Sequence, residues 1–273
     1  MSMSPLFYWA SAFLLAALAG LFISFKVLKV DQERNSDLIN AMLAILGTLV
    51  AVLLGMLVSS ADEQYRAMED CVNSEATSIT EVFRLTRGLS PAFASVLQDR
   101  CIGYCDKVLS AEWPSMKKGE ASAAVSDEYI QLSDSITKFR PANAGEAEVQ
   151  SALLSATHDV EADRARRIVV SRSSSARRLL PLIMTCAIVI LACSYLYVGK
   201  GNLWLHSVLV GLVAIILGTN IGVIFLMTRP FASEWSIQPE AIELSVKAMR
   251  RIKQQFPTGV VPGAGHEEPR ATP

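Results

Sequence analysis

The chain has 273 residues, of which 51% are hydrophobic and 19% are charged, and its formal net charge is −1. This near-neutral charge excludes the strongly basic surface that is typical of nucleic-acid-binding proteins, so no nucleic acid is expected as a partner. The hydrophobic content instead indicates membrane spans combined with a soluble part.

Four runs without a charged side chain predict the fold class. Each has about 20 residues or more, the length that a helix needs to cross the hydrocarbon of a bilayer. A helix of a soluble protein rarely stays apolar on every face for this length. We therefore expect an all-α integral membrane protein, with two pairs of transmembrane helices and a helical bundle between the pairs. The runs are residues 6–25, 38–58, 179–198 and 203–227.

Lysine and arginine near the membrane predict the orientation. The middle segment and the termini carry about eight such residues near the spans and the two short loops about four, which places the termini and the middle in the cytoplasm. The predicted parts are transmembrane helices 1 and 2 (1–58), a cytoplasmic helical region (59–178), transmembrane helices 3 and 4 (179–227), an amphipathic helix (228–256) and a disordered tail (257–273).

The second run has no helix breaker at its end, because no glycine or proline occurs between Met56 and Arg87. Apolar residues continue at helical spacing, which predicts one helix of about 70 Å that ends near Gly88 and Pro91. Further helices are expected over residues 91–113, where Pro114 would stop the helix, and over residues 126–139, 146–178 and 239–256.

No motif indicates catalysis, since glycine-rich phosphate loops, Gly-x-Ser-x-Gly and His-Glu-x-x-His are all absent. We expect neither an enzyme nor a cofactor. Cys101 and Cys105 are one helical turn apart, but no histidine or further cysteine nearby completes a metal site, so we interpret them as packed thiols.

Small residues follow one face of the second run, at Asn40, Ala44, Thr48, Ala51 and Gly55. Such a stripe allows close helix packing, but in an oligomer it could also line a water-filled path. Similar stripes in the first run (Ala12, Ala16, Gly20) and the fourth (Gly211, Gly218, Gly222) favour packing.

Acidic residues follow the second run. Asp62 and Glu63 would form carboxylate rings at the mouth of a path and favour cations, or they would simply face solvent. Glu75 falls on the apolar stripe of the same helix, where a buried carboxylate needs a partner. An arginine near the third run would supply it, unless Glu75 only skirts the stripe. The candidates are Arg164, Arg166, Arg167 and Arg172.

Four groups of residues resemble the bestrophin-like family of bacterial membrane proteins, over roughly residues 5–250. The family usually has an aspartate where this chain has Thr228 and a glycine where it has Ser233, so the chain departs from the pattern there. The groups are Glu75 with Ala76; Tyr104 with Glu112, Trp113, Pro114 and Gly119; the arginines from Arg164 to Arg172; and Arg229, Pro230 and Phe231.

The resemblance implies two spans, a helical cytoplasmic middle and two more spans. A more remote similarity to bestrophins proper implies a pentameric ion channel whose second span lines the pore, by analogy of architecture. We therefore expect a homo-oligomeric, cation-preferring channel of the inner cell membrane, in contact with membrane lipid. The competing hypothesis is a non-conducting scaffold or sensor whose cytoplasmic helices bind a partner. The sequence does not specify the permeant ion.

Overall fold

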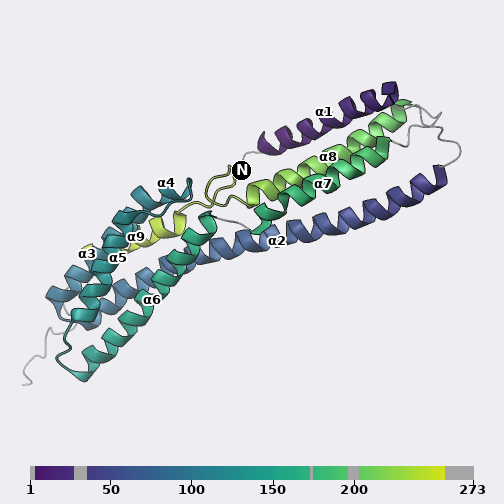
Figure 1. Ribbon diagram of the computed structural model, residues 1–273. Helices are drawn as coiled ribbons and strands as arrows, with labels where there is room; N and C mark the ends of the chain where they lie inside the picture. The colour runs from purple at the N-terminus through teal and green to yellow at the C-terminus, as the bar shows by residue number, and fades with distance from the viewer. Residues whose placement is uncertain (1–3, 28–35, 173–174, 196–202, 256–273) are drawn as a thin grey trace, which may run out of the picture. The chain divides into compact units, whose positions relative to one another are not determined.

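The computed structural model describes residues 4–27, 36–172, 175–195 and 203–255, and every secondary-structure element in these ranges is helical (Figure 1). Three of these helices are long and apolar enough to cross a membrane, with apolar stretches that begin at Leu6, Ala41 and Trp204. The described apolar part of the predicted third span, Pro181–Tyr195, is shorter. The all-helical fold is thus confirmed, together with three membrane-capable helices.

The chain forms two compact units. The first unit comprises residues 1–69 and 170–237, and the second comprises residues 70–169 and 238–273. Helix α2 (Ser36–Leu85) runs without interruption from one unit into the other, over about 75 Å. The unbroken helix that the sequence predicted therefore exists, and a short 3-10 turn, Thr86–Gly88, follows it.

The first unit contains α1 (Ser4–Val27), the first part of α2, α7 (Ser175–Tyr195) and α8 (Leu203–Met227). Its apolar core joins all four helices, with Val50 and Leu54 of α2 packed among residues such as Phe13, Ile190 and Leu217. Helix α1 lies against α8, and α7 contacts both.

Glycines on α8 bring it close to α1. A Cβ atom added at Gly218 would lie 2.8 Å from the Trp9 carbonyl oxygen, and one at Gly222 would lie 3.1 Å from the Trp9 side chain. The packing interpretation is therefore correct for this stripe. In α1 the structure bears it out only at Gly20, where an added Cβ would lie 2.7 Å from the Tyr195 ring, while Ala12 and Ala16 are exposed in the single chain. Because the glycines of α8 provide the space for a close approach, the face of α1 that contacts α8 can carry larger side chains such as Trp9 and Phe13.

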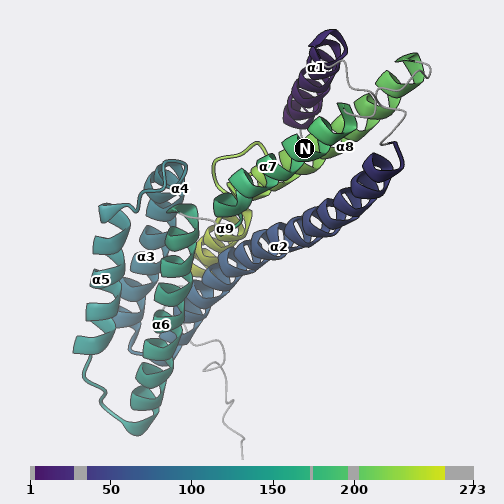
Figure 2. The ribbon, with the colours of Figure 1, turned by 45° about the vertical axis from the view of Figure 1, so that its right-hand side comes forward.

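The second unit is a helical bundle in which α3 contacts both α5 and α9, and Figure 2 shows α3, α5 and α6 side by side. Buried apolar residues from each helix fill its core, among them Phe83, Leu97, Leu132, Val160 and Met249. The remaining bounds are α3 (Pro91–Lys107), a π-helix (Val108–Glu112), α4 (Trp113–Met116), α5 (Ala123–Lys138), α6 (Ala144–Arg172) and α9 (Glu240–Gln255).

Pro114 does not stop the helix, contrary to the sequence-based expectation. The helical path continues from α3 through the π-helix into α4, and Pro114 lies in the first turn of α4. Proline has no N–H to donate to the preceding turn, and the π-helix directly before it already departs from the regular α-helical hydrogen-bond pattern.

We predict that Gly218→Ala lowers the thermal stability of the purified protein, because its new methyl group would push α1 and α8 apart. Gly55→Ala is the matched control, since no atom lies within 4 Å of the added Cβ. Alanine is also the better helix former by roughly 0.5–1 kcal/mol. The control should therefore melt at the same temperature as the parent or higher, and equal melting of the two variants would contradict the contact.

Candidate functional site

The small residues of α2 lie on one uncovered face, which we call the small face (Ala44, Thr48, Ala51 and Gly55). All four are exposed, and an added Cβ at Gly55 would meet open space. The Thr48 hydroxyl donates to the Ala44 carbonyl at 2.8 Å, so it is already bonded within the helix. The side chain of Asn40, the fifth predicted member, lies outside the described part of the chain.

Helix α2 has two further faces at this level. At 100° per residue, the buried face with Val50 and Leu54 lies roughly 110° from the small face on one side. A face of large exposed side chains lies roughly 120° away on the other side. The small face is thus flanked by one packed and one bulky surface. The bulky face contains Met42, Ile45, Leu49, Val52, Leu53 and Met56.

An apolar groove of about 440 Å³ borders the small face and is walled by α2, α7 and α8. Ser194 and Asn220 are its polar side chains, and its α2 wall combines small and large residues: Leu43, Gly47, Val50, Ala51, Leu54 and Gly55. Asn220 donates to the Ile216 carbonyl at 2.9 Å. Asn220 is not among the residues predicted from the sequence, although an amide side chain in an otherwise apolar run indicates a functional position.

The two predicted mouth residues differ in their surroundings. Asp62 accepts a hydrogen bond from Arg66 at 2.8 Å, so its charge is partly offset. Glu63 is exposed and forms no ion pair among the described residues. Asp62 is 18 residues, or five whole turns, after Ala44 and so continues the line of the small face, whereas Glu63 lies in line with Ile45 of the bulky face. Glu63 therefore carries the less compensated negative charge at this level of α2, but to one side of the small face.

Glu75 belongs to a buried cluster of charges in the second unit. Its carboxylate accepts hydrogen bonds from Arg167 Nε at 2.7 Å and Nη2 at 2.8 Å, and from the Tyr104 hydroxyl at 2.7 Å. Arg167 and Glu75 are both 0% exposed. The other candidate partners do not contact Glu75: Arg164 pairs elsewhere, Arg166 is exposed, and the Arg172 side chain lies outside the described part.

Glu112 completes the cluster. It accepts hydrogen bonds from Arg167 at 2.9 Å and from Arg164 Nη2 at 2.5 Å. Two carboxylates thus face two guanidinium groups, so the cluster has no excess charge. The Trp113 ring lies 5.4 Å from the Arg167 guanidinium carbon, within the range of a cation–π contact. We call these residues the buried charge cluster (Glu75, Tyr104, Glu112, Arg164 and Arg167).

The protonation states in the cluster follow from its surroundings. Burial alone would lower the pKa of Arg167, but the Glu75 and Glu112 carboxylates outweigh it and raise that pKa. Burial and the neighbouring Glu75 raise the pKa of Tyr104 well above its usual value, so its hydroxyl stays a donor. Arg167 therefore stays charged and Tyr104 stays protonated. The hydrogen bonds of the cluster tie α2, α3, the π-helix and α6 together.

The π-helix explains how Glu112 reaches this interior. Tyr104, Val108, Glu112 and Met116 are all buried at intervals of four residues. In a regular α-helix the last would lie about 120° around the axis from the first. The wider π turn reduces this drift and keeps Glu112 directed inward. Hydrophobic periodicity does not reveal such a turn, which is why the sequence analysis placed a regular helix here.

The remaining family-motif residues lie in the first unit at the end of α8. Pro230 and Phe231 are buried, and the Ile237 N–H donates to the Pro230 carbonyl at 2.7 Å. Arg229 is exposed, with its guanidinium carbon 4.5 Å from the centre of the Phe225 ring. The motif thus closes a turn and leaves its arginine at the surface.

The two cysteines of α3 are fully buried, at 0% exposure each. Burial is the main cause that raises the pKa of both thiols, so they stay protonated. Within the described ranges, no group of three or more His, Cys, Asp or Glu side chains is placed to hold a metal ion.

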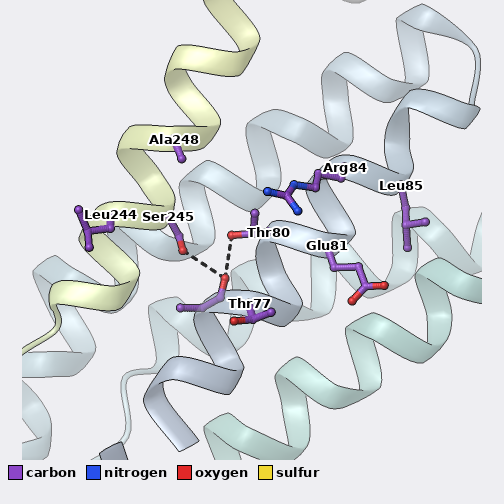
Figure 3. A pocket seen from close by; sticks show the side chains of 9 residues that line it. Thr77, Thr80, Glu81, Arg84, Leu85, Leu244, Ser245 and Ala248 are labelled. Atoms are coloured by element: carbon purple, nitrogen blue, oxygen red, sulfur yellow. Dashed lines mark hydrogen bonds between the residues drawn. The ribbon is translucent and has the colours of Figure 1, made fainter. Parts of the chain in front are cut away.

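A second groove, of about 760 Å³, lies between α2 and α9 in the second unit (Figure 3). The Ser245 hydroxyl of α9 donates to the Ala76 carbonyl of α2 at 3.2 Å and so joins the two helices, and the Thr80 hydroxyl donates to the same carbonyl within α2 at 2.7 Å. Leu244, 57% exposed, and Arg84 line the groove. Ion pairs of 2.6 Å (Arg250–Asp106) and 2.5 Å (Lys253–Asp99) hold α9 on α3.

We predict that Glu75→Ala sharply lowers the melting temperature, because it leaves Arg167 buried beside a single carboxylate. Breaking a buried pair costs about 3–5 kcal/mol, which corresponds to a fall of roughly 6–20 °C in a chain of this size. Glu75→Gln, which keeps an acceptor, should cost less.

The control for Glu75 is Asp134→Ala, which breaks the exposed pair with Lys138. Such a pair contributes at most about 0.5 kcal/mol. Melting of Glu75→Ala within a degree or two of this control would show that the cluster does not stabilise the fold.

Comparison with known proteins places the chain in a family. Neither a curated protein nor a solved structure gave a match. The family model described as the Bestrophin-like domain matches residues 11–242, well over half of the chain. The resemblance inferred from the sequence is therefore confirmed, and the chain belongs to the Bestrophin-like domain family.

Proposed function

We propose that this protein is a homo-oligomeric ion channel of the inner cell membrane, with the small face of α2 lining the path and a preference for cations. In this proposal α1, α2, α7 and α8 are four spans, and the termini and the second unit are cytoplasmic. Membership of the Bestrophin-like family supports a channel-like membrane protein.

The observation that carries the proposal is the exposure of the small face. Glycines on α8 are covered by α1, whereas an added Cβ at Gly47 or Gly55 of α2 would meet no atom within 4 Å. Short side chains leave room for water, and several copies of α2 around an axis would enclose it. One chain alone cannot form such a path, so the proposal requires an oligomer, a pentamer by the analogy with bestrophins.

Electrostatics supports the cation preference. Asp62, Glu63 and Arg66 give each copy a net charge of −1 over about one turn of α2, close to the end of the small face. A ring of such mouths concentrates cations and repels anions.

A non-conducting scaffold or sensor is the second candidate, and the α2–α9 groove favours it. Leu244 is 57% exposed beside this groove, and neither Glu81 nor Arg84 forms an ion pair among the described residues. A partner helix with an apolar ridge and charged flanks would fit such a surface.

We predict that purified protein in liposomes conducts under a salt gradient, with a reversal potential on the cation side. Glu63→Gln should move this potential toward zero, because the mouth loses its less compensated charge. Adding Asp62→Asn should move it further. An absence of current above that of empty liposomes, over a range of pH, calcium and voltage, would favour the scaffold.

The path itself is tested by side-chain size. Gly55→Leu and Ala51→Phe should reduce the current, since they fill the small face. Leu49→Phe enlarges the bulky face of the same helix and should leave the current unchanged. If the three variants behave alike, the small face does not line the path.

The orientation requires introduced cysteines, because Cys101 and Cys105 are buried and do not report on access. Lys117 is exposed in the second unit. We predict that an impermeant thiol reagent labels Lys117→Cys in permeabilised cells but not in intact cells, and labelling in intact cells would reverse the orientation.

A further inference from the structure

Arg229 lies where the apolar part of α8 ends. The apolar stretch Trp204–Met227 has 24 residues, or about 36 Å as a helix, against about 30 Å of hydrocarbon. Arg229 is the first charged residue after it and is exposed. When α8 crosses the membrane, the Arg229 guanidinium lies at the level of the lipid headgroups.

Aromatic residues fix this position. The Arg229 guanidinium carbon is 4.5 Å from the Phe225 ring centre, and the Phe225 ring is 5.2 Å from that of Trp9 on α1. Tyr8 is 74% exposed beside Trp9 in the sequence. Tryptophan and tyrosine are enriched at the membrane interface, so this arrangement holds the arginine at the membrane surface.

No ion pair to Arg229 is found among the residues that the structure describes. Its described contacts include the Phe225 ring but no carboxylate. Arg66 of the same unit, by contrast, is paired with Asp62 at 2.8 Å. The planar guanidinium has five N–H donors in a geometry that matches phosphate oxygens, so its natural partner here is an anion of that shape.

We propose that Arg229, positioned by Phe225 and Trp9, binds the phosphate of an anionic phospholipid headgroup. A lipid is the source that the location favours, because the guanidinium lies at the boundary of an apolar helix. The proposal depends on the chain being a membrane protein and not on its conducting ions.

The test is native mass spectrometry of the full-length protein, with bound lipid counted as phosphatidylglycerol or phosphatidylcholine is added. One basic residue near an anionic lipid surface contributes about 1 kcal/mol, so Arg229→Gln should weaken phosphatidylglycerol binding about fivefold. Phosphatidylcholine binding should change little. Arg66→Gln is the matched control and should keep the phosphatidylglycerol preference of the parent.

Two further variants separate charge from position. Arg229→Lys keeps the charge but loses the planar set of donors, so it should bind phosphatidylglycerol more weakly than the parent and more tightly than Arg229→Gln. Phe225→Leu keeps the arginine but removes the ring beneath it and should also weaken binding. Phe225→Leu also tests the site if Arg229→Gln fails to fold. Unchanged phosphatidylglycerol binding in either Phe225→Leu or Arg229→Gln would overturn the proposal.

The source of the phosphate is tested by competition. Inorganic phosphate at millimolar concentration should not displace the lipid, and full displacement would identify a site for free phosphate instead. Loss of lipid binding only when copies associate would show that an acidic group of a second copy takes the place of the lipid. Either result would overturn the proposal of a lipid site, and neither depends on whether the protein is a channel.

Discussion

Side-chain size is the constraint on which the first unit depends. In hydrocarbon, burial of apolar surface gives helices little reason to associate, so close packing decides which faces meet. The glycines of α8 close such a contact, with Gly218 against the backbone of Trp9. The glycines of α2, Gly47 and Gly55, form no such contact with any residue that the structure describes. Glycine thus lies in a helix–helix contact on α8 and on an uncovered surface on α2.

The second unit is constrained by charge instead. Arg167 is fully buried, and removing a guanidinium from water costs several kcal/mol unless carboxylates surround it. Glu75 and Glu112 provide them from two separate segments, and Tyr104 orients Glu75. This requirement fixes the register of α2, α6 and the π-helix relative to one another, because a slip along any helix would leave a buried charge without a partner.

Much of the fold is predictable because periodicity and run length are local properties. The all-helical fold, the unbroken α2 and the inward position of Glu75 all follow from spacing alone. The choice of Arg167 among four arginines does not, since it depends on how α6 rotates against α2. The inward orientation of the Glu112 side chain could not be predicted either, because no local sequence pattern indicates the π-helix that produces it.

Two expectations were met only in part or not at all, for the same reason. The stripe of Ala12, Ala16 and Gly20 satisfied the pattern for helix packing, yet Gly20 alone of the three makes a close contact among the described residues, with Tyr195, and the two alanines are exposed. Pro114 satisfied the pattern for a helix end, yet it lies in a first turn. In both cases the residue type allows a particular structure, a close helix contact or a helix end. The packing of the neighbouring segment decides whether that structure forms.

The central claim is that the small face of α2 surrounds a path shared by several copies. The most direct measurement is single-particle imaging of the protein in lipid nanodiscs, at a resolution that distinguishes the faces of α2. The account predicts a ring with an axial opening lined by Ala44, Thr48, Ala51 and Gly55. A monomer, or a ring whose axis is filled by Met42, Ile45 and Leu49, would contradict it.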